Sequence, residues 1–575
     1  MKLLTQIKVC AFWPQSNLTL GALAESLVSS TVRRHLLFWV LTGWVVVFVG
    51  YYYGTFDQIF HLPFLKKYAD PALYARDPFF ALNAQHYSFF WYLFVPFYRQ
   101  GILEVATFVI HLAVTYATFW AVWTLSETLF HDPLVPLIAC VGLAFPHVGF
   151  AGFPLLEFSL LNRTFVLPFL LWAMVLYLRR RYVPAFSLLG LMYNVHVISV
   201  HFVLAMFLFD SVLQFRRIGL RALVGGMAAF VVCALPVLLW KAGGGPTDFS
   251  LRPEWFATLA QGAYYQMYNF WAPYPQIVLT TLSGLGTLVL FAIGRWRAPA
   301  TEQGQSATRF MGAVLMILAL EFVTARWLPV TLIIQLQLMR VGVFAVLFGY
   351  LYFASYLVRR FRSGALGRFD VGVLTAAMCF SPFPFMLVII WGAQRLIASL
   401  RWRKIILPTA LAALLAGSVA IAQYLGLWGP GVHVFPQRTD WYDVQLWARN
   451  NTPKDALFIT PPHIYGFYET SWRVFSERST VVLFSDLIDI VYSPEYLETW
   501  RSRFEDLAPG ALSQFRGDFF GNQAITARSF YNLSSADLQR IAHKYGAEYL
   551  VMEKPNMRAL PVVYENGRFI LYAVP

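Results

Sequence analysis

The residue best placed for chemistry is Asp57, which ends the sequence Gly54-Thr55-Phe56-Asp57 just after the first long apolar run. A carboxylate at the edge of a membrane can ionise, accept a proton from an attacking hydroxyl group or bind a divalent cation. The structural alternative is that the aspartate caps the first turn of a helix that begins near Gln58. The polar residues in the neighbouring loops favour the chemical interpretation.

The residues that accompany Asp57 can exchange protons or hold an anion. Arginine grips a phosphate group with a forked pair of hydrogen bonds, so the set suits a phosphate-linked substrate. Asp77, which precedes Pro78, could instead start a helix, and Arg163 could anchor a helix end among lipid headgroups. The accompanying residues are His61, Asp70, Arg76 and Asp77 in the same loop, Glu157 and Arg163 in the next, and Arg340 near Gln335 and Gln337.

Two histidines, His196 and His201, lie five positions apart in an apolar hairpin. Two metal ligands on one face of a helix would lie four positions apart. We therefore interpret both histidines as satisfied or cavity-lining residues, with metal ligation as the alternative.

The elements that must position these residues are membrane helices. Of the 575 residues, 58% are hydrophobic and only 13% are charged, about half the charged share of a soluble domain. Apolar runs long enough to cross a bilayer recur from Leu37 to Trp428. This composition excludes an ordinary soluble enzyme and indicates a polytopic membrane protein.

The positive charge of the chain does not indicate nucleic-acid binding. The net charge is +14, but from Gly429 onward there are 14 Lys and Arg against 16 Asp and Glu. The excess therefore belongs to the membrane part, where basic clusters stand at the ends of apolar runs, as the positive-inside bias requires. We expect membrane lipid around this part and no nucleic-acid partner.

The topology of the chain can be predicted from the rule that basic clusters lie on the cytoplasmic side of the membrane. We predict a mainly α, polytopic transmembrane helix bundle of about 11 to 13 spans, with a small extracytoplasmic α/β domain at the C-terminus. Breaks at Tyr193-Asn194 and at Ser381-Pro382-Phe383-Pro384 indicate two hairpins. We expect residues 1–36 in the cytoplasm, residues 37–428 in the plasma (inner) membrane with long outer loops at 55–101 and 241–275, and residues 429–575 outside.

The C-terminal segment alternates helical and extended patterns. Strands are predicted at 456–460, 480–484, 548–552 and 569–574, and helices at 443–450, 495–507 and 535–545. The two outer loops contain short apolar stretches that are typical of helices at the membrane interface.

This arrangement resembles the GT-C superfamily of membrane glycosyltransferases, which use polyprenyl-phosphate-linked sugars. The likeness rests on an outward acid just past the first span (Asp57), a long first outer loop with Asp70-Pro71-Ala72-Leu73-Tyr74-Ala75-Arg76-Asp77-Pro78, and Asn162-Arg163-Thr164 at the start of a span. The tail resembles those of uncharacterised bacterial relatives, as in Leu446-Trp447-Ala448-Arg449-Asn450-Asn451-Thr452-Pro453. Two departures are Gln58, where many relatives have a second acid, and the absence of a Trp-Trp-Asp motif, which argues against N-glycosylation.

The resemblance implies a division of labour. Asp57 and Glu157 would be the catalytic acids, and they would also be the ligands of a divalent cation, Mg²⁺ or Mn²⁺, if one is bound. Arg163 or Arg340 would bind the lipid phosphate. The remaining candidates for substrate binding are Asp77, His61, His196 and Gln337.

The expected function is transfer of a sugar from a polyprenyl-phosphate-linked donor to a glycan, lipid or protein acceptor on the outer face. A glycan ligase or polymerase is one alternative, but it would need Arg and His in a long outer loop, and residues 241–275 contain Lys241 and Arg252 without a histidine. A non-catalytic scaffold subunit or a transporter is the other. A transporter would be expected to show inverted repeats, which we do not find in this sequence.

Overall fold

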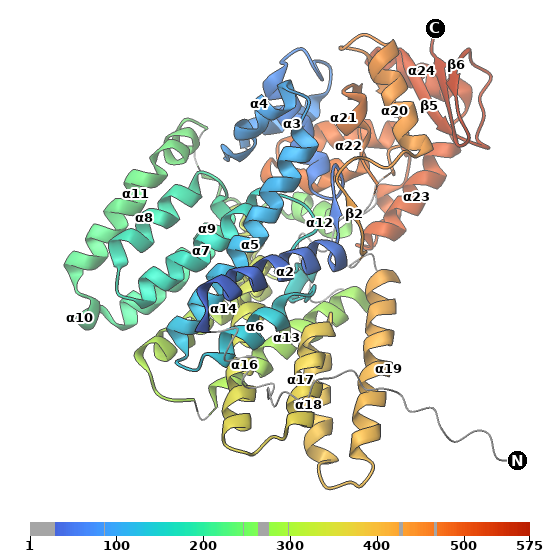
Figure 1. Ribbon diagram of the computed structural model, residues 1–575. Helices are drawn as coiled ribbons and strands as arrows, with labels where there is room; N and C mark the ends of the chain where they lie inside the picture. Colours follow the sequence, from blue (N-terminus) through green and yellow to red (C-terminus); the bar gives the residue numbers. More distant parts are fainter. Residues whose placement is uncertain are drawn as a thin grey trace, which may run out of the picture.

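The computed structural model describes residues 29–85, 87–244, 247–262, 275–296, 298–424, 429–464 and 469–575. Most of the predicted cytoplasmic segment 1–36 lies outside the described residues, as does most of the second half of the predicted loop 241–275. The described chain is mainly helical. In Figure 1 the long helices form the lower part, and the segment predicted as the first outer loop lies beside the C-terminal elements at the top.

Seven of the described helices are long and apolar enough to cross a membrane. Five further apolar helices are shorter. The 11 to 13 predicted spans therefore correspond to seven full-length helices and these five shorter ones among the described residues. The long helices are α2 (Thr31–Phe48), α5 (Leu103–Leu129), α11 (Leu220–Gly243), α13 (Pro275–Arg295), α14 (Glu302–Thr324), α16 (Gly342–Arg362) and α19 (Arg403–Tyr424). The shorter ones are α6 (Leu134–Leu143), α7 (Asn162–Leu178), α8 (Tyr182–Tyr193), α9 (Val197–Leu213) and α18 (Pro384–Leu396).

Helix α16 forms the centre of the bundle, because its sides are covered almost completely by neighbouring helices. It packs closely against α13 through glycines on both helices. A Cβ atom at Gly349 would lie 2.6 Å from the carbonyl oxygen of Thr287, and one at Gly294 would lie 2.2 Å from that of Tyr352. Small residues at such contacts let two membrane helices approach backbone to backbone, which fixes the position of the N-terminus of α16.

The segment that leaves α2 is tied to the C-terminal part of the chain. Strand β1 (Tyr51–Tyr52) pairs in parallel with β2 (Val432–His433). Gly54 has a φ of +76°, and a Cβ atom there would lie 2.8 Å from the ring of Phe475, so the tight turn into the next helix requires glycine. That helix is α3 (Gln58–Ala69), and it is followed by η1 (Pro78–Gln85), η2 (Phe90–Phe94) and α4 (Val95–Arg99).

The C-terminal part contains a five-stranded mixed sheet in the order β4-β3-β5-β7-β6. Strand β3 (Leu457–Ile459) pairs in parallel with β4 (Ser479–Thr480) and β5 (Tyr549–Glu553), while β7 (Phe569–Ala573) pairs antiparallel with β5 and β6 (Val562–Glu565). The helices of this part are α20 (Asp440–Asn451), α21 (Trp472–Ser476), α22 (Tyr496–Leu507), α23 (Phe519–Tyr531) and α24 (Ser535–Tyr545). The α/β pattern agrees with the prediction.

One predicted strand was wrong over most of its length. Residues 480–484 were expected to be extended in the sheet, but β4 ends at Thr480 and a 3-10 helix, η5 (Phe484–Tyr492), begins at Phe484. The carboxylate of Asp486 accepts a hydrogen bond from the backbone N–H of Leu483, which closes the first turn of η5 in place of a sheet ladder. Helix α12 (Pro253–Gly262) packs against η5. Helix α15 (Thr331–Gln335) also contacts η5, and η4 (Leu338–Val341) follows it just before α16.

Candidate functional site

A cavity of about 620 Å³ lies where the ends of several helices meet. The beginnings of α3, α7 and α9, the end of α11, η4 before α16, and η5 of the C-terminal part all contribute to its wall. Its charged and titratable residues are Asp57, His61, Tyr68, Tyr87, Arg163, His196, His201, Lys241, Asp248, Arg252, Arg340, Asp489, Tyr492 and Glu495.

The central feature of the cavity is an ion-pair cluster around Arg163. The Nη1 atom of Arg163 donates a hydrogen bond to Oδ2 of Asp57 at 2.5 Å. Its Nε and Nη2 atoms donate to the two carboxylate oxygens of Glu157 at 2.5 and 2.7 Å. Asp57 and Arg163 line the cavity, whereas Glu157 lies behind Arg163 and does not. The guanidinium group therefore holds two carboxylates in fixed orientations.

The structure does not support the alternative in which the side chain of Asp57 caps a helix. Asp57 occupies the N-cap position of α3, but its side chain makes no capping hydrogen bond there. Burial by itself would raise the pKa of the Asp57 carboxyl group, but the positive charges of Arg163 and Arg340 outweigh burial and hold the pKa below its ordinary value. Asp57 is therefore ionised at neutral pH.

Arg340 differs from Arg163 in having no carboxylate partner among the described residues. Its guanidinium carbon lies 4.5 Å from the centroid of the Phe153 ring, and its buried Nε atom has no hydrogen-bond partner in the described part of the chain. A buried guanidinium group with unused donors is a ready binding site for an anion.

Gln337 contributes through its backbone. It has a φ of 47° and a ψ of 56°, a left-handed conformation that is uncommon outside glycine and asparagine. Its carbonyl oxygen accepts a hydrogen bond from the N–H of Arg340 at 3.0 Å, so this turn sets the direction in which Arg340 leaves the chain. The side chain of Gln337 is buried and does not line the cavity. Its placement therefore does not support the prediction that Gln337 binds substrate.

Besides His201, two histidines line the same cavity. His61 lies one turn beyond Asp57 on α3 and stacks on Trp91, with ring centroids 5.5 Å apart. Burial lowers the pKa of His61 to about 4, so the ring is neutral at pH 7. His196 is the N-cap of α9, where its ring accepts a hydrogen bond from the backbone N–H of Ser199 at 3.3 Å. Both rings add polar but uncharged surface to the wall.

The rest of the wall is apolar and aromatic. It comes mainly from α3, from the segment around η2 and from the start of α9. A cavity whose wall combines charged groups with a broad apolar surface matches an amphiphile that carries a phosphate group. The residues of this side are Phe60, Phe64, Tyr68, Tyr87, Trp91, Val197 and Ile198.

Two lining residues in η5, Asp489 and Tyr492, were not anticipated. Asp489 is only 5% exposed. Burial and the negative charge of Asp57 raise the pKa of the Asp489 carboxyl group well above its ordinary value. The available signal was the presence of two aspartates in the otherwise apolar run Val481–Tyr492, because such buried acids require a specific environment.

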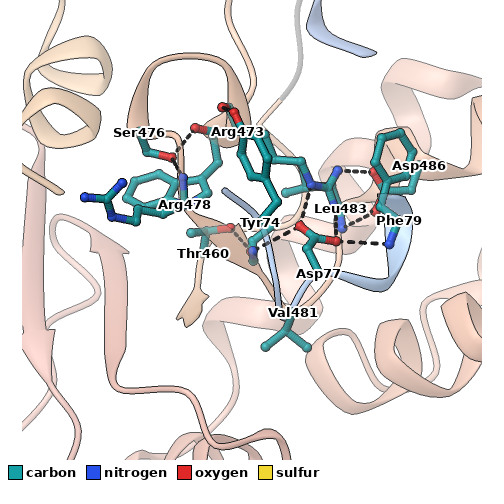
Figure 2. A network of polar contacts seen from close by, with 12 residues as sticks. Tyr74, Asp77, Phe79, Thr460, Arg473, Ser476, Arg478, Val481, Leu483 and Asp486 are labelled. Atoms are coloured by element: carbon teal, nitrogen blue, oxygen red, sulfur yellow. Dashed lines mark hydrogen bonds and ion pairs between the residues drawn. The ribbon is translucent and has the colours of Figure 1, made fainter. Parts of the chain in front are cut away.

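The placement of Asp77 corrects another prediction. We expected it to bind substrate, but its side chain is fully buried against Arg473 of α21, away from the cavity. Figure 2 shows Arg473 between the carboxylates of Asp77 and Asp486, with Nε to Oδ2 of Asp77 at 2.7 Å and Nη1 to Oδ1 of Asp486 at 2.5 Å. These three residues form an interior clamp that joins the first outer loop to η5.

The same geometry bears on the expected divalent cation. No group of three or more His, Cys, Asp or Glu side chains in the described ranges is arranged to hold a metal ion. Asp57 and Glu157 are both bonded to Arg163, whose positive charge stands where a shared cation would neutralise them. These donors do not fit a resident Mg²⁺ or Mn²⁺ ion as they stand, and no step below uses one.

Comparisons with known proteins give limited matches. Residues 439–507 match a family described as a domain of unknown function, DUF6798. No curated protein matches the chain. Among solved structures, the fold is similar to ArnT from Cupriavidus metallidurans bound to undecaprenyl phosphate, with a TM-score of 0.42, 12% identity, and coverage of 96% of this chain and 98% of that one. At this TM-score the similarity supports no assignment of function, which therefore has to come from the cavity itself.

Proposed function

We propose that this protein is a membrane glycosyltransferase that moves a sugar from a polyprenyl-phosphate-linked donor to the hydroxyl group of an acceptor. The observation that carries the proposal is the presence in one cavity of an ionised carboxylate, Asp57, and an arginine without a carboxylate partner among the described residues, Arg340. The first can take a proton and the second can hold a phosphate group.

Arg340 and the apolar wall would bind the polyprenyl-phosphate-linked sugar donor. The phosphodiester of a polyprenyl phosphate sugar carries one negative charge, which the unused donors of Arg340 can bind. Phe64, Tyr68 and Trp91 offer apolar surface for the first part of the lipid chain. Arg163 is less suited to this role because three of its five N–H groups already bond to carboxylates.

Asp57 accounts for activation of the acceptor. The acceptor oxygen attacks the anomeric carbon, its proton passes to Asp57, and the bond between that carbon and the phosphate oxygen breaks with its electron pair on the oxygen. Arg340 stabilises the negative charge that develops on the phosphate, in a cavity partly shielded from water. Arg163 and Glu157 act by positioning, because together they fix the orientation of the Asp57 carboxylate.

The test is release of undecaprenyl phosphate from a panel of undecaprenyl phosphates that carry different hexoses and pentoses. Purified protein in lipid nanodiscs would be supplied with each donor and with a total envelope extract as acceptor. We expect release with at least one donor and strong loss in Asp57→Asn. If the intact protein releases undecaprenyl phosphate from none of them, the proposal is wrong and the scaffold alternative is favoured.

A further inference from the structure

The 3-10 helix η5 carries two aspartates, Asp486 and Asp489, that have different surroundings. Asp486 belongs to the interior clamp, where it bonds to Arg473. Asp489, three positions later, lines the cavity instead. Residues three apart in a 3-10 helix lie on the same side of it, so the clamp directly positions the side of η5 that carries Asp489.

The backbone around Asp489 is held from several directions. The indole N–H of Trp255 donates to the carbonyl oxygen of Ile490 at 3.2 Å. The side-chain amide of Gln335 donates to the carbonyl oxygen of Tyr492 at 3.4 Å. Together with the Arg473–Asp486 ion pair, these contacts fix η5 on the residues just before and just after Asp489. The segment that carries Asp489 is thus held in place where Asp489 lines the cavity.

The clamp does not need Asp489. The Nε, Nη1 and Nη2 atoms of Arg473 all bond to Asp77 or Asp486. Asp489 is therefore not part of the interior clamp, and its place in the cavity wall has to be considered separately.

The charges near Asp489 come from several elements. Burial and the negative charges of Asp57 and Asp486 raise the pKa of the Asp489 carboxyl group, and the positive charges of Arg473 and Arg340 offset this only in part. Tyr492 and Glu495 face the same cavity. The pKa of Asp489 is therefore raised and that of Asp57 is lowered, although both line the same cavity. Two carboxyl groups whose environments separate them in this way form an acid–base pair.

We propose that Asp489 is the catalytic acid of the transfer and gives its proton to the lipid phosphate as the phosphate leaves. The inference rests on the proposed function. It also assigns the C-terminal part a direct share in the chemistry, because the proton donor comes from η5.

The proton balance closes over one turnover. The acceptor proton goes to Asp57 as the acceptor oxygen bonds to the anomeric carbon. The bond from that carbon to the phosphate oxygen breaks, and the proton of Asp489 goes to the phosphate, which leaves as a monoanion. Asp57 is then protonated and Asp489 ionised, and one proton passes from Asp57 to Asp489 through water in the cavity. The net result is transfer of the acceptor proton to the phosphate.

The kinetic test compares Asp489→Asn and Asp489→Glu with intact protein across the pH range. The matched control is Glu498→Gln, whose carboxylate lies nearby on α22 but is 73% exposed. We expect Asp489→Asn to lower kcat by about 100-fold to 10,000-fold with KM little changed. We also expect it to abolish the loss of rate at high pH that ionisation of Asp489 causes in the intact protein. Asp489→Glu should recover part of the rate, and Glu498→Gln should match the intact protein.

The intact protein alone keeps the inference falsifiable if Asp489→Asn does not fold. If kcat of the intact enzyme does not fall with rising pH up to the pH at which the protein unfolds, no acid has to remain protonated, and this result would overturn the inference. An unchanged kcat in a folded Asp489→Asn variant would overturn it as well.

An infrared measurement separates this inference from the proposed function. A protonated carboxyl group has a C=O stretching band that a carboxylate lacks, and at pH 7 this band should weaken in Asp489→Asn relative to intact protein. An unchanged band rejects the proton donor, whatever the reaction. A changed band in a protein that releases undecaprenyl phosphate from no donor rejects the proposed function and leaves the protonated state of Asp489 standing.

Discussion

Arg163 and Asp57 are joined by a 2.5 Å hydrogen bond across 106 positions of sequence. The bond changes how the two arginines of the cavity are assigned. Sequence reasoning left the lipid phosphate to either Arg163 or Arg340. Because Arg163 already neutralises Asp57 and Glu157, its role is to orient the base, and Arg340 is left to bind the anion.

Replacement of the base tests the centre of the proposal. We expect Asp57→Asn to lower the rate of undecaprenyl phosphate release by about 100-fold to 10,000-fold, because an amide cannot accept the acceptor proton. The matched control is Asp70→Asn in the same outer loop. Asp70 is a partly exposed residue that pairs with Lys454 at 2.7 Å outside the cavity. A rate in Asp57→Asn equal to that of the control would show that Asp57 is not the base.

Replacement of Arg340 tests the anion site. Hydrogen bonds to a charged group contribute about 1.5–3 kcal/mol, so Arg340→Gln should weaken binding of undecaprenyl phosphate by about 10-fold to 150-fold. Native mass spectrometry or a lipid-binding titration would measure the change. Arg362→Gln is the control, because Arg362 lies at the other end of α16 and pairs with Asp132. Equal affinity in the two variants would place the phosphate elsewhere.

The interior clamp predicts a large effect on stability. Arg473→Met removes the positive charge and leaves Asp77 and Asp486 buried together, which we expect to cost about 3–5 kcal/mol. The control is Arg540→Gln, because Arg540 is 65% exposed and solvent screens its pair with Asp537. Thermal unfolding in detergent would compare the two. A similar unfolding temperature for both variants would contradict a stabilising clamp.

Because His61 is buried in the folded protein, we expect the free energy of unfolding to depend on pH. Burial lowers its pKa from 6.5 to about 4 in the folded protein. Between these values the unfolded chain binds a proton that the folded chain does not, so stability falls as pH drops from 6.5 to 4 and is unaffected by this group above 6.5. Asp57 remains ionised through this window because its pKa is held below 3.8.

We therefore expect His61→Gln to reduce the fall in unfolding temperature over that pH range. His463, whose pKa burial also lowers to about 4, should account for a further part, so the double variant should be flatter still. His131→Gln, at an exposed histidine, is the control. An identical pH profile in intact protein and His61→Gln would show that His61 is not the group responsible.

The helices of the bundle could be predicted because a bilayer imposes a length that is visible in the sequence. Two of the long apolar runs, for example, form the helices Leu103–Leu129 and Leu220–Gly243. The predicted breaks at Tyr193-Asn194 and at Ser381-Pro382-Phe383 separate α8 from α9 and Phe380 from α18. Both signals are local, as are the proline and polar residues that end a helix.

The site could be predicted only in part because its contacts join distant parts of the chain. Asp57 and Arg163 were singled out from their positions at span ends, and the fold brings both to one cavity. Asp77 was misassigned because its partner Arg473 is 396 positions away, and its sequence neighbours gave no sign of burial. Asp489 was missed because residues 485–494 were assigned no element, so nothing in the sequence placed them in the cavity wall.

The cavity wall is completed late in the chain. Strand β2 at Val432–His433 pairs with the segment that leads from α2 to Asp57, and η5 contributes Ile488, Asp489 and Tyr492 to the wall. During synthesis, the membrane helices emerge from the ribosome before either element exists. A polypeptide that stopped before these two elements would carry all of its membrane helices and still lack part of the cavity wall, so the cavity can form only after the C-terminal part has been made.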